Sequence, residues 1–217
     1  MSAGPASRPQ AILFDWDNTL VDTWPVIREA LNTTLTAYGH EPWSMEEVRA
    51  RVRKSTRDRF PELFGDQWEE ATKLFYSRYD EIHKSKLEPA DGAQSMLSRL
   101  AELGFYLGVV SNKRGDFLRA EAAHLGWAEY FGALVGATDA PRDKPAREPV
   151  DLALAPAGLQ PGPEIWFVGD TDIDMECAAN ARCTGVLIGG HVAETDPVNA
   201  HVSHRFADCM ALCNFLD

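Results

Sequence analysis

The sequence lacks a long apolar run and is poor in cysteine. None of its hydrophobic stretches approaches the roughly 20 residues that a membrane-spanning helix needs, so we expect no membrane segment. Its four cysteines show neither a Cys-x-x-Cys pair nor a zinc-like spacing with histidine, and this usage is typical of free thiols in a reducing cytoplasm. Residues 1–9 also lack the apolar stretch of a secretory signal, and we expect a disordered tail there.

Positive charge is scarce as well. The chain carries 21 lysines and arginines against 33 aspartates and glutamates, which gives a net charge of -12. Binding to a nucleic-acid backbone needs clustered positive charge, so the composition argues against nucleic acid as the main partner. One stretch departs from this average, because six basic residues fall within eleven positions. They are Arg49, Arg51, Arg53, Lys54, Arg57 and Arg59.

Short apolar runs that suit buried strands alternate with helical patterns over most of the chain. This order of strand, helix and strand implies a parallel sheet covered by helices on both faces, which is the α/β class with a Rossmann-like core. At 217 residues the chain has room for one or two domains. We expect strands at residues 10–14, 105–110, 133–135, 165–168 and 186–188.

The alternation stops between residues 20 and 88, where we find helical patterns and no convincing strand. Thr23, two residues before a proline, favours the start of one helix, and the pattern Ser44-Met45-Glu46-Glu47 has the form of a capping box that opens another. We therefore expect a small all-helical domain over residues 20–88, inserted into a core made of residues 10–19 and 89–217.

Polar side chains follow several of the expected strands. Ligands bind beyond the carboxyl ends of the strands in an open parallel sheet, so we expect these side chains to converge although they are far apart in the chain. An acidic residue after a single strand is often only a helix cap, and the indication therefore comes from the whole set. The set is Asp15 and Asp17, Ser111 and Asn112, Lys144 in the connection "TDAPRDKPAREP", and Asp170 with Asp174.

Two carboxylates beside positive groups suit phosphoryl transfer through a covalent aspartyl-phosphate. A carboxylate that attacks a phosphate dianion meets a repulsion of several kcal/mol at ~4 Å and intermediate dielectric, so the site needs a divalent cation and a fixed positive side chain. Asp15 and Asp170 offer hard oxygen donors appropriate to Mg²⁺, and Lys144 offsets further charge. Ser111 offers a hydroxyl donor to a phosphoryl oxygen. Asp17 stands two residues from Asp15, so in extended backbone both point the same way and Asp17 suits acid and base work.

Four segments resemble, in order and spacing, the motifs of the haloacid dehalogenase superfamily of phosphohydrolases. They are "DWDNTLVDT", "VVSNK", "KPAREP" and "VGDTDIDMECAANA". The likeness covers residues 11 to about 190 and is closest to the phosphoglycolate-phosphatase-like branch, in which a helical cap follows the first motif. The resemblance implies that residues 20–88 form this cap and that Ser111 and Asn112 hold the phosphoryl group.

The resemblance also implies a role for each charged residue of the set. Asp15 is the expected nucleophile, and Asp17 is the expected acid and base, with its main-chain carbonyl on the metal. Asp170 is expected to be a further Mg²⁺ ligand. Asp174 is expected either to bind the metal or to orient metal-bound water and Lys144.

The chain departs from the family's pattern at a few positions. Trp16 stands where the family usually has a small aliphatic residue, and we expect its side chain to point away from the two carboxylates and pack. Asn18 stands where glycine is usual, but asparagine tolerates positive φ, so the turn can form. Arg147 occupies a place where proline is frequent, and Arg53 falls at the glycine of the cap's substrate loop, which leaves the substrate open.

The leading hypothesis is a Mg²⁺-dependent phosphatase, a phosphoric monoester hydrolase that acts on small metabolites such as phosphoglycolate or sugar phosphates. Two interpretations of the basic run stay open: Lys54 and Arg57 bind an anionic group of the substrate, or the run is an exposed helix face. A sugar phosphomutase is the alternative among enzymes. A non-enzymatic phosphoacceptor domain is disfavoured by the Asp-x-Asp spacing and the helical insertion. We expect a cytoplasmic monomer or homodimer.

Overall fold

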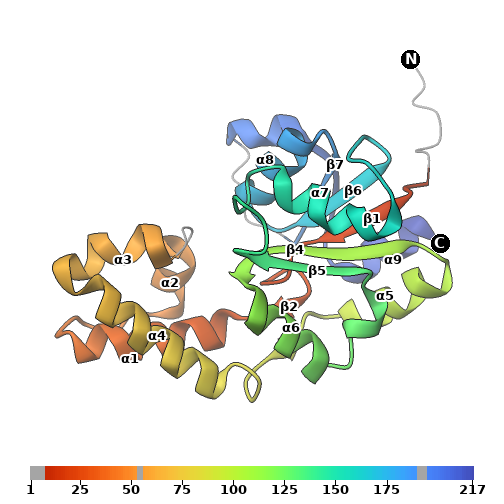
Figure 1. Cartoon of the computed structure of the whole chain (residues 1–217). Coiled ribbons are helices and arrows are strands. Elements are labelled where there is room, and N and C mark those ends of the chain that lie inside the picture. The colour runs from red at the N-terminus through yellow and green to blue at the C-terminus, as the bar shows by residue number, and fades with distance from the viewer. Residues whose placement is uncertain (1–7, 53–55, 190–194) are drawn as a thin grey trace. The chain divides into compact units, whose positions relative to one another are not determined.

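The chain divides into two compact units. A computed structural model describes residues 8–52, 56–189 and 195–217, without the side chains of residues 56–58 (Figure 1). The first unit comprises Met1–Val21 with Pro89–Asp217, and the second comprises Asp22–Glu88. The expected tail falls mostly outside the described residues. Arg8 is described, and its guanidinium lies over the Phe105 ring at 4.3 Å.

The first unit is built on a six-stranded sheet in which all neighbouring strands are parallel. Its strands are β1 (Ala11–Phe14), β4 (Tyr106–Arg114), β5 (Ala133–Ala137), β6 (Ile165–Gly169), β7 (Thr184–Ile188) and β8 (Val202–Phe206). They lie in the order β5-β4-β1-β6-β7-β8. The polar ends of β1, β4 and β6 therefore finish side by side in the middle of the sheet, which is where the expected site must form.

All five expected strands are present, with two differences in the sheet. β4 continues past Val110 to Arg114 with a register shift against β5, so Ser111 and Asn112 lie within this strand and not after it. The extension of β4 through these polar residues was not expected, because the strand was predicted from its apolar run alone. β8 was not expected, since this edge strand alternates half-buried and exposed residues and has no continuous apolar run.

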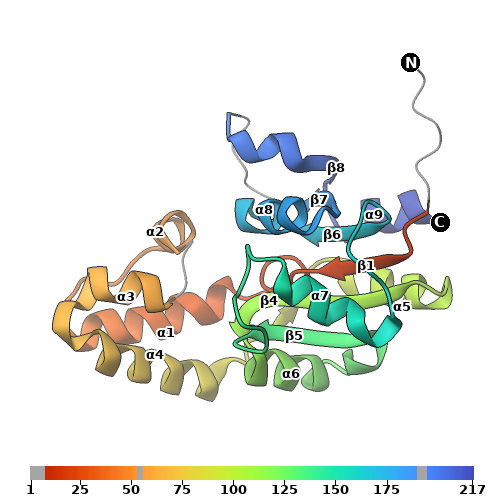
Figure 2. The same ribbon diagram turned by 45° about the horizontal axis from the view of Figure 1, so that its top comes forward.

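Helices flank both faces of the sheet. They are α5 (Ala93–Glu102), α6 (Gly115–His124), α7 (Glu148–Leu154), α8 (Asp172–Ala181) and α9 (Cys209–Leu216). Figures 1 and 2 show α7 and α8 on one side, with α5 and α6 on the other. Leu13 of β1 and Phe167 of β6 share a buried cluster with Val150 of α7 and Ala178 of α8. The structure therefore confirms the α/β class with a Rossmann-like core.

The second unit is a bundle of helices. They are α1 (Trp24–Ala37), α2 (Met45–Arg51), α3 (Thr56–Phe64) and α4 (Trp68–Ile82). Thr23 occupies the N-cap position of α1. Ser44 forms the expected capping box with Glu47: the Glu47 N–H donates to Ser44 Oγ at 3.2 Å, and the Ser44 N–H donates to Glu47 Oε2 at 2.9 Å. Two-residue strands that the sequence did not indicate, β2 (Val21–Asp22) and β3 (Glu88–Pro89), pair with each other at the ends of this segment.

Two general expectations can be compared with the described part of the chain. No helix within it has the length and apolar composition needed to cross a membrane. All four cysteines are free thiols, as their spacing predicted.

Candidate active site

The loop after β1 carries the first two acidic residues. The amide N–H of Asp15 donates to the Val168 carbonyl of β6 at 2.8 Å, so Asp15 continues the sheet and is only 6% exposed. Asn18 then turns the chain with φ 62°, which confirms that asparagine supplies the conformation usual for glycine here. Its amide N–H donates to the Val21 carbonyl at 2.6 Å and closes the turn.

Three carboxylates from different elements meet beside one lysine. Oxygen atoms of Asp15, Asp170 and Asp174 lie within 4.8 Å of one another. The Lys144 amine donates to Asp15 Oδ1 at 2.6 Å and to Asp174 Oδ1 at 2.7 Å. Lys144 is 7% exposed, so this is a buried contact and not a surface ion pair. Residues up to 159 positions apart thus converge at the carboxyl ends of β1 and β6, as the predicted topology requires.

Burial and crowding shift the pKa values of these groups. Burial raises the pKa of Asp15 to about 7, aided by the Asp174 and Asp17 carboxylates and opposed by Lys144. Burial, together with Asp174 and Asp15, raises the pKa of Asp170 well above its ordinary value. Burial lowers the pKa of Lys144, but the carboxylates of Asp15 and Asp174 raise it further, so the amine stays charged. One ammonium therefore does not offset the charge of the carboxylates.

The donor set fits a divalent cation. Asp15 and Asp170 are hard oxygen donors. The pKa values of both carboxyl groups are raised in this crowded place, and a bound cation would offset the repulsion between their negative charges. Asp174 is engaged differently, because Oδ1 accepts from Lys144 while Oδ2 accepts from the Thr171 N–H at 3.0 Å and from its hydroxyl at 2.6 Å. Thr171 and Asp174 form the capping box that opens α8.

Asn112 and Ser111 lie on β4 next to this cluster. Asn112 Nδ2 donates to the Lys144 carbonyl at 3.0 Å, and the Lys144 N–H donates to Asn112 Oδ1 at 2.9 Å. The amide side chain therefore holds the backbone of the lysine. Ser111 is 5% exposed, and its hydroxyl oxygen accepts from the Lys113 N–H at 3.1 Å.

The Asp17 carboxylate has a different cationic partner. The Lys113 amine lies 2.6 Å from Asp17 Oδ1 and 2.5 Å from Glu121 Oε2. Sequence reasoning missed both partners. Lys113 is part of the motif "VVSNK", so the sequence drew attention to its position. Glu121 of α6 belongs to no motif, and nothing in the sequence singles it out from the other residues of that helix.

Trp16 packs away from the carboxylates, as expected. Its indole is fully buried and lies 5.8 Å from the Trp127 ring and 6.4 Å from the Phe131 ring, edge to face in both cases. The indole N–H donates to Glu121 Oε2 at 2.7 Å. The unusual residue between the two aspartates therefore reaches the same glutamate as Lys113.

The basic run belongs to the second unit and is only partly described. Lys54 and the side chain of Arg57 lie outside the described residues. The Arg51 guanidinium lies 4.7 Å from the centre of the Trp43 ring and 3.1 Å from Glu47, which is the arrangement of a surface helix. In the first unit, Arg147 pairs with Asp151 at 3.0 Å.

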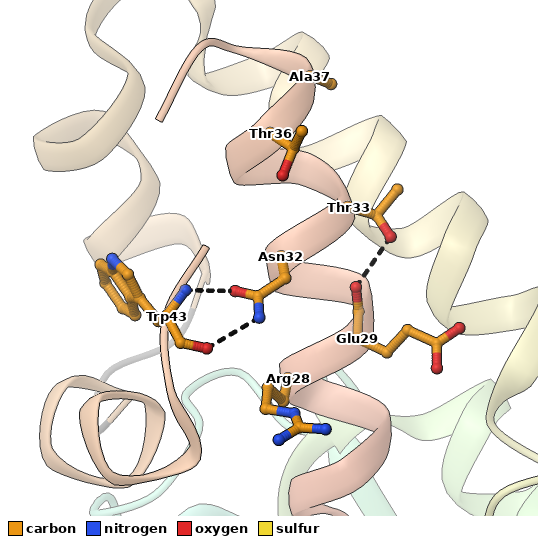
Figure 3. A pocket seen from close by; sticks show the side chains of 7 residues that line it. All are labelled: Arg28, Glu29, Asn32, Thr33, Thr36, Ala37 and Trp43. Carbon is orange, nitrogen blue, oxygen red and sulfur yellow. Dashed lines mark hydrogen bonds between the residues drawn. The ribbon is translucent and has the colours of Figure 1, made fainter. Parts of the chain in front are cut away.

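The second unit has a hollow of about 670 Å³ along α1. Figure 3 shows Asn32 pointing to Trp43, with its amide donating to the Trp43 carbonyl and accepting from the Trp43 N–H, both at 2.8 Å. The amide is thus used to fasten the loop before α2. The hollow is lined by Arg28, Glu29, Asn32, Thr33, Thr36, Ala37 and Trp43, and none of these is a predicted site residue.

Comparison with known proteins agrees with this geometry. The family of haloacid dehalogenase-like hydrolases matches residues 12–188. A phosphoglycolate phosphatase of Chromobacterium violaceum is 28% identical over 203 residues, which cover 89% of this chain and 91% of that protein. An N-acetylmuramic acid 6-phosphate phosphatase of Pseudomonas aeruginosa is 32% identical over 179 residues, which cover 80% and 79%. The crystal structure of a predicted phosphoglycolate phosphatase from Haemophilus somnus has the same fold, with a TM-score of 0.84 at 22% identity over 96% of this chain and 98% of that one.

The chain therefore belongs to the haloacid dehalogenase-like hydrolase family, as its four motifs predicted. Within that family it is a phosphoric monoester hydrolase similar to the phosphoglycolate phosphatases.

Proposed function

We propose that this protein is a Mg²⁺-dependent phosphatase that hydrolyses small-metabolite phosphomonoesters through an aspartyl-phosphate on Asp15. The observation that carries the proposal is the buried Lys144 amine, which lies between the carboxylates of Asp15 and Asp174 at 2.6 and 2.7 Å. Such an ammonium holds one carboxylate in a fixed orientation and offsets charge where a phosphoryl group would approach.

Asp15 and Asp170 are the residues that would hold the cation. When bound, the ion supplies positive charge that offsets the repulsion between the Asp15 carboxylate and a phosphate dianion. Asp17 would add its main-chain carbonyl. Asp174 then orients Lys144, because both of its carboxylate oxygens already accept hydrogen bonds from Lys144 and Thr171.

The reaction proceeds in two displacements at phosphorus. An Asp15 oxygen attacks, the bond to the leaving oxygen breaks, and that oxygen takes a proton from Asp17. Water then attacks the aspartyl-phosphate, Asp17 takes a proton from the water, and the bond to Asp15 breaks to release inorganic phosphate. Lys144 and the Ser111 hydroxyl donate to phosphoryl oxygens, and Asn112 acts through the Lys144 backbone that it holds.

The substrate is proposed to be a small phosphomonoester with a second anionic group. Two relatives are named for phosphoglycolate and for N-acetylmuramic acid 6-phosphate, and both names denote acids that carry a phosphate. Residues 20–88 are proposed to act as a cap over the substrate. Lys54 and Arg57 of its basic run suit recognition of the second anionic group, since arginine binds carboxylates with two parallel hydrogen bonds.

Phosphate release tests the proposal. The purified protein would be assayed with 4-nitrophenyl phosphate, phosphoglycolate, hexose phosphates and N-acetylmuramic acid 6-phosphate, with Mg²⁺ and with a chelator. We expect release only with the cation. Asp15→Asn should lower the rate by about three orders of magnitude or more, because it removes the nucleophile. Asp172→Asn, a nearby change outside the carboxylate cluster, should retain the rate.

Three results would contradict the proposal or redirect it. Phosphate release by Asp15→Asn at the rate of the unaltered protein would exclude Asp15 as the nucleophile. Full activity with the chelator would exclude the role of the cation. Conversion of a hexose 1-phosphate into a hexose 6-phosphate would identify a phosphomutase instead.

We also propose a cytoplasmic location, which the four free cysteines support. The proposed oligomeric state is a monomer or a homodimer.

A further inference from the structure

A buried group of charges beside Asp17 has no part in the reaction as proposed above. The Lys113 amine lies 2.6 Å from Asp17 Oδ1 and 2.5 Å from Glu121 Oε2. The Trp16 indole N–H donates to the same glutamate oxygen at 2.7 Å. Glu121 is fully buried and Lys113 is 9% exposed. One ammonium thus links a residue of the catalytic loop to a carboxylate in the core.

Both lysines of the catalytic unit lie at this site. Residues 1–21 and 89–217 contain Lys113 and Lys144 and otherwise carry their positive side chains as arginine or histidine. Lys144 pairs with Asp15, whereas Lys113 pairs with Asp17. The two aspartates are only two positions apart in the chain. Because each has its own ammonium group, Asp17 does not compete with the nucleophile Asp15 for Lys144.

Stability alone does not account for the pair of Lys113 and Glu121. Taking two charges out of water costs several kcal/mol per ion, and apolar residues of similar volume often stabilise a core at least as well. The third partner supplies a reason, because the Asp17 side chain is 25% exposed at the loop while Glu121 is inaccessible. The Lys113 amine thus connects Asp17 to the packed interior of the unit. Glu121 lies on α6, and the Trp16 ring lies 5.8 Å from the Trp127 ring.

We propose that Lys113, itself held by Glu121, is a positioning residue that fixes the Asp17 carboxylate for proton transfer to the leaving oxygen. The inference rests on the proposed function, in which Asp17 is the acid and base. Proton transfer requires the acid within hydrogen-bond reach of the leaving oxygen. A misplacement of about 1 Å is enough to cost about 100-fold in rate. Trp16 contributes through the hydrogen bond that it donates to Glu121.

Substrates with different leaving groups separate this role from a structural one. A poor leaving group needs a proton as its bond to phosphorus breaks, whereas 4-nitrophenolate leaves readily without one. Phenyl phosphate and 4-nitrophenyl phosphate share the same ring, so they differ mainly in this need. Partial unfolding of a variant lowers kcat/KM equally for both. The ratio of the two kcat/KM values therefore reports on proton donation and not on the amount of folded protein.

The experiment measures this ratio for the full chain with Mg²⁺ and for four variants. Lys113→Met should lower kcat/KM for phenyl phosphate about tenfold or more relative to kcat/KM for 4-nitrophenyl phosphate. This expected change is a part of the 10²–10⁴-fold effect that general acid catalysis usually has. Asp17→Asn should change the ratio in the same direction and further. Lys113→Gln keeps a donor for Glu121 and serves if the methionine variant does not fold. Arg119→Met is the matched control, because Arg119 lies on α6 like Glu121, and its ion pair is with Asp139, which follows β5, and does not involve Asp17.

The outcomes distinguish the inference from the proposed function. If Asp17→Asn changes the ratio and neither Lys113 variant does, Lys113 does not position the acid and the inference is overturned. If Asp17→Asn leaves the ratio unchanged, Asp17 is not the acid, and the proposed role of Asp17 falls together with the inference. A change of the ratio in Arg119→Met as large as in Lys113→Met would also overturn it, because any lost ion pair would then act alike.

Discussion

Two lysines pair with different acidic groups of the candidate active site. Lys144 lies between Asp15 and Asp174, and Lys113 lies between Asp17 and Glu121. Each ammonium is buried against two carboxylates, so removing it leaves like charges facing each other in a poorly solvated place. At the scale of single residues, we therefore expect charge balance to affect both the stability of this site and its proposed chemistry.

Lys144→Met should therefore remove activity and destabilise the fold. We expect a loss of about 3–5 kcal/mol in the free energy of unfolding, because the substitution breaks a buried pair and leaves its carboxylates uncompensated. Urea unfolding at pH 8 measures the loss. The matched control is Lys86→Met in the second unit, which breaks a half-exposed pair with Glu29 and should cost less than about 1 kcal/mol. Equal losses in the two variants would contradict the importance of burial at Lys144.

Single residues also show which details the sequence could predict. Asn18 was expected to take positive φ because its side chain tolerates that conformation, and it does so at 62°. Trp16 was expected to pack away from the carboxylates because it is large and apolar, and it is fully buried. The partner of its indole N–H could not be predicted, since Glu121 is 105 positions away and becomes a neighbour only when α6 packs on the sheet.

At the scale of elements, the backbone of β5 closely approaches the start of α6, next to the residue Lys113 of the candidate site. A methyl group added at Gly136 would lie 2.4 Å from Gly115 Cα and 2.7 Å from the Lys113 carbonyl oxygen, both backbone atoms. No flexible side chain is available there to move aside. The approach falls where β4 shifts register against β5, and Gly115 is only three residues after Asn112. The two glycines thus set the path of the backbone that carries Lys113.

Gly136→Ala should destabilise the protein by about 1–3 kcal/mol, because a methyl group in a filled space forces the backbone to shift. The same shift should lower phosphatase activity, since it displaces the carbonyl of Lys113. Thermal and urea unfolding, with 4-nitrophenyl phosphate hydrolysis, measure the two effects. Gly162→Ala is the matched control, because its methyl group would have no atom within 4 Å. A stable and fully active Gly136→Ala protein would show that the close approach has no influence.

At the scale of the whole molecule, the helical unit is an insertion between two neighbouring points of the first unit. The Ala90 N–H donates to the Leu20 carbonyl at 2.9 Å, and β2 pairs with β3 next to that bond. The chain therefore leaves and re-enters the first unit at almost the same place. Such a connection lets a domain be removed without stretching the backbone that it interrupts.

A chain in which a short Gly-Ser linker joins Val21 to Pro89 should fold. The first unit has its own sheet and its own buried cluster, so we expect one cooperative unfolding transition in urea. The shortened chain should still hydrolyse 4-nitrophenyl phosphate faster than its own Asp15→Asn variant. It should lose preference among metabolites, since Lys54 and Arg57 are absent. A shortened chain without cooperative unfolding would show that residues 22–88 are required for the catalytic unit to fold.

Local periodicity and short motifs in the sequence were enough to predict the apolar strands of the sheet, the insertion of helices, and the acidic, lysine and serine residues that are proposed for the site. They did not indicate β8, whose residues alternate at an exposed edge, or the extension of β4 through polar Ser111 to Arg114. The pairing of each lysine with its aspartate is known from the folded structure and could not be predicted from the sequence. Those pairings join residues from separate strands and helices, so they follow from packing and from the need of buried charges for partners, and neither is local in the chain.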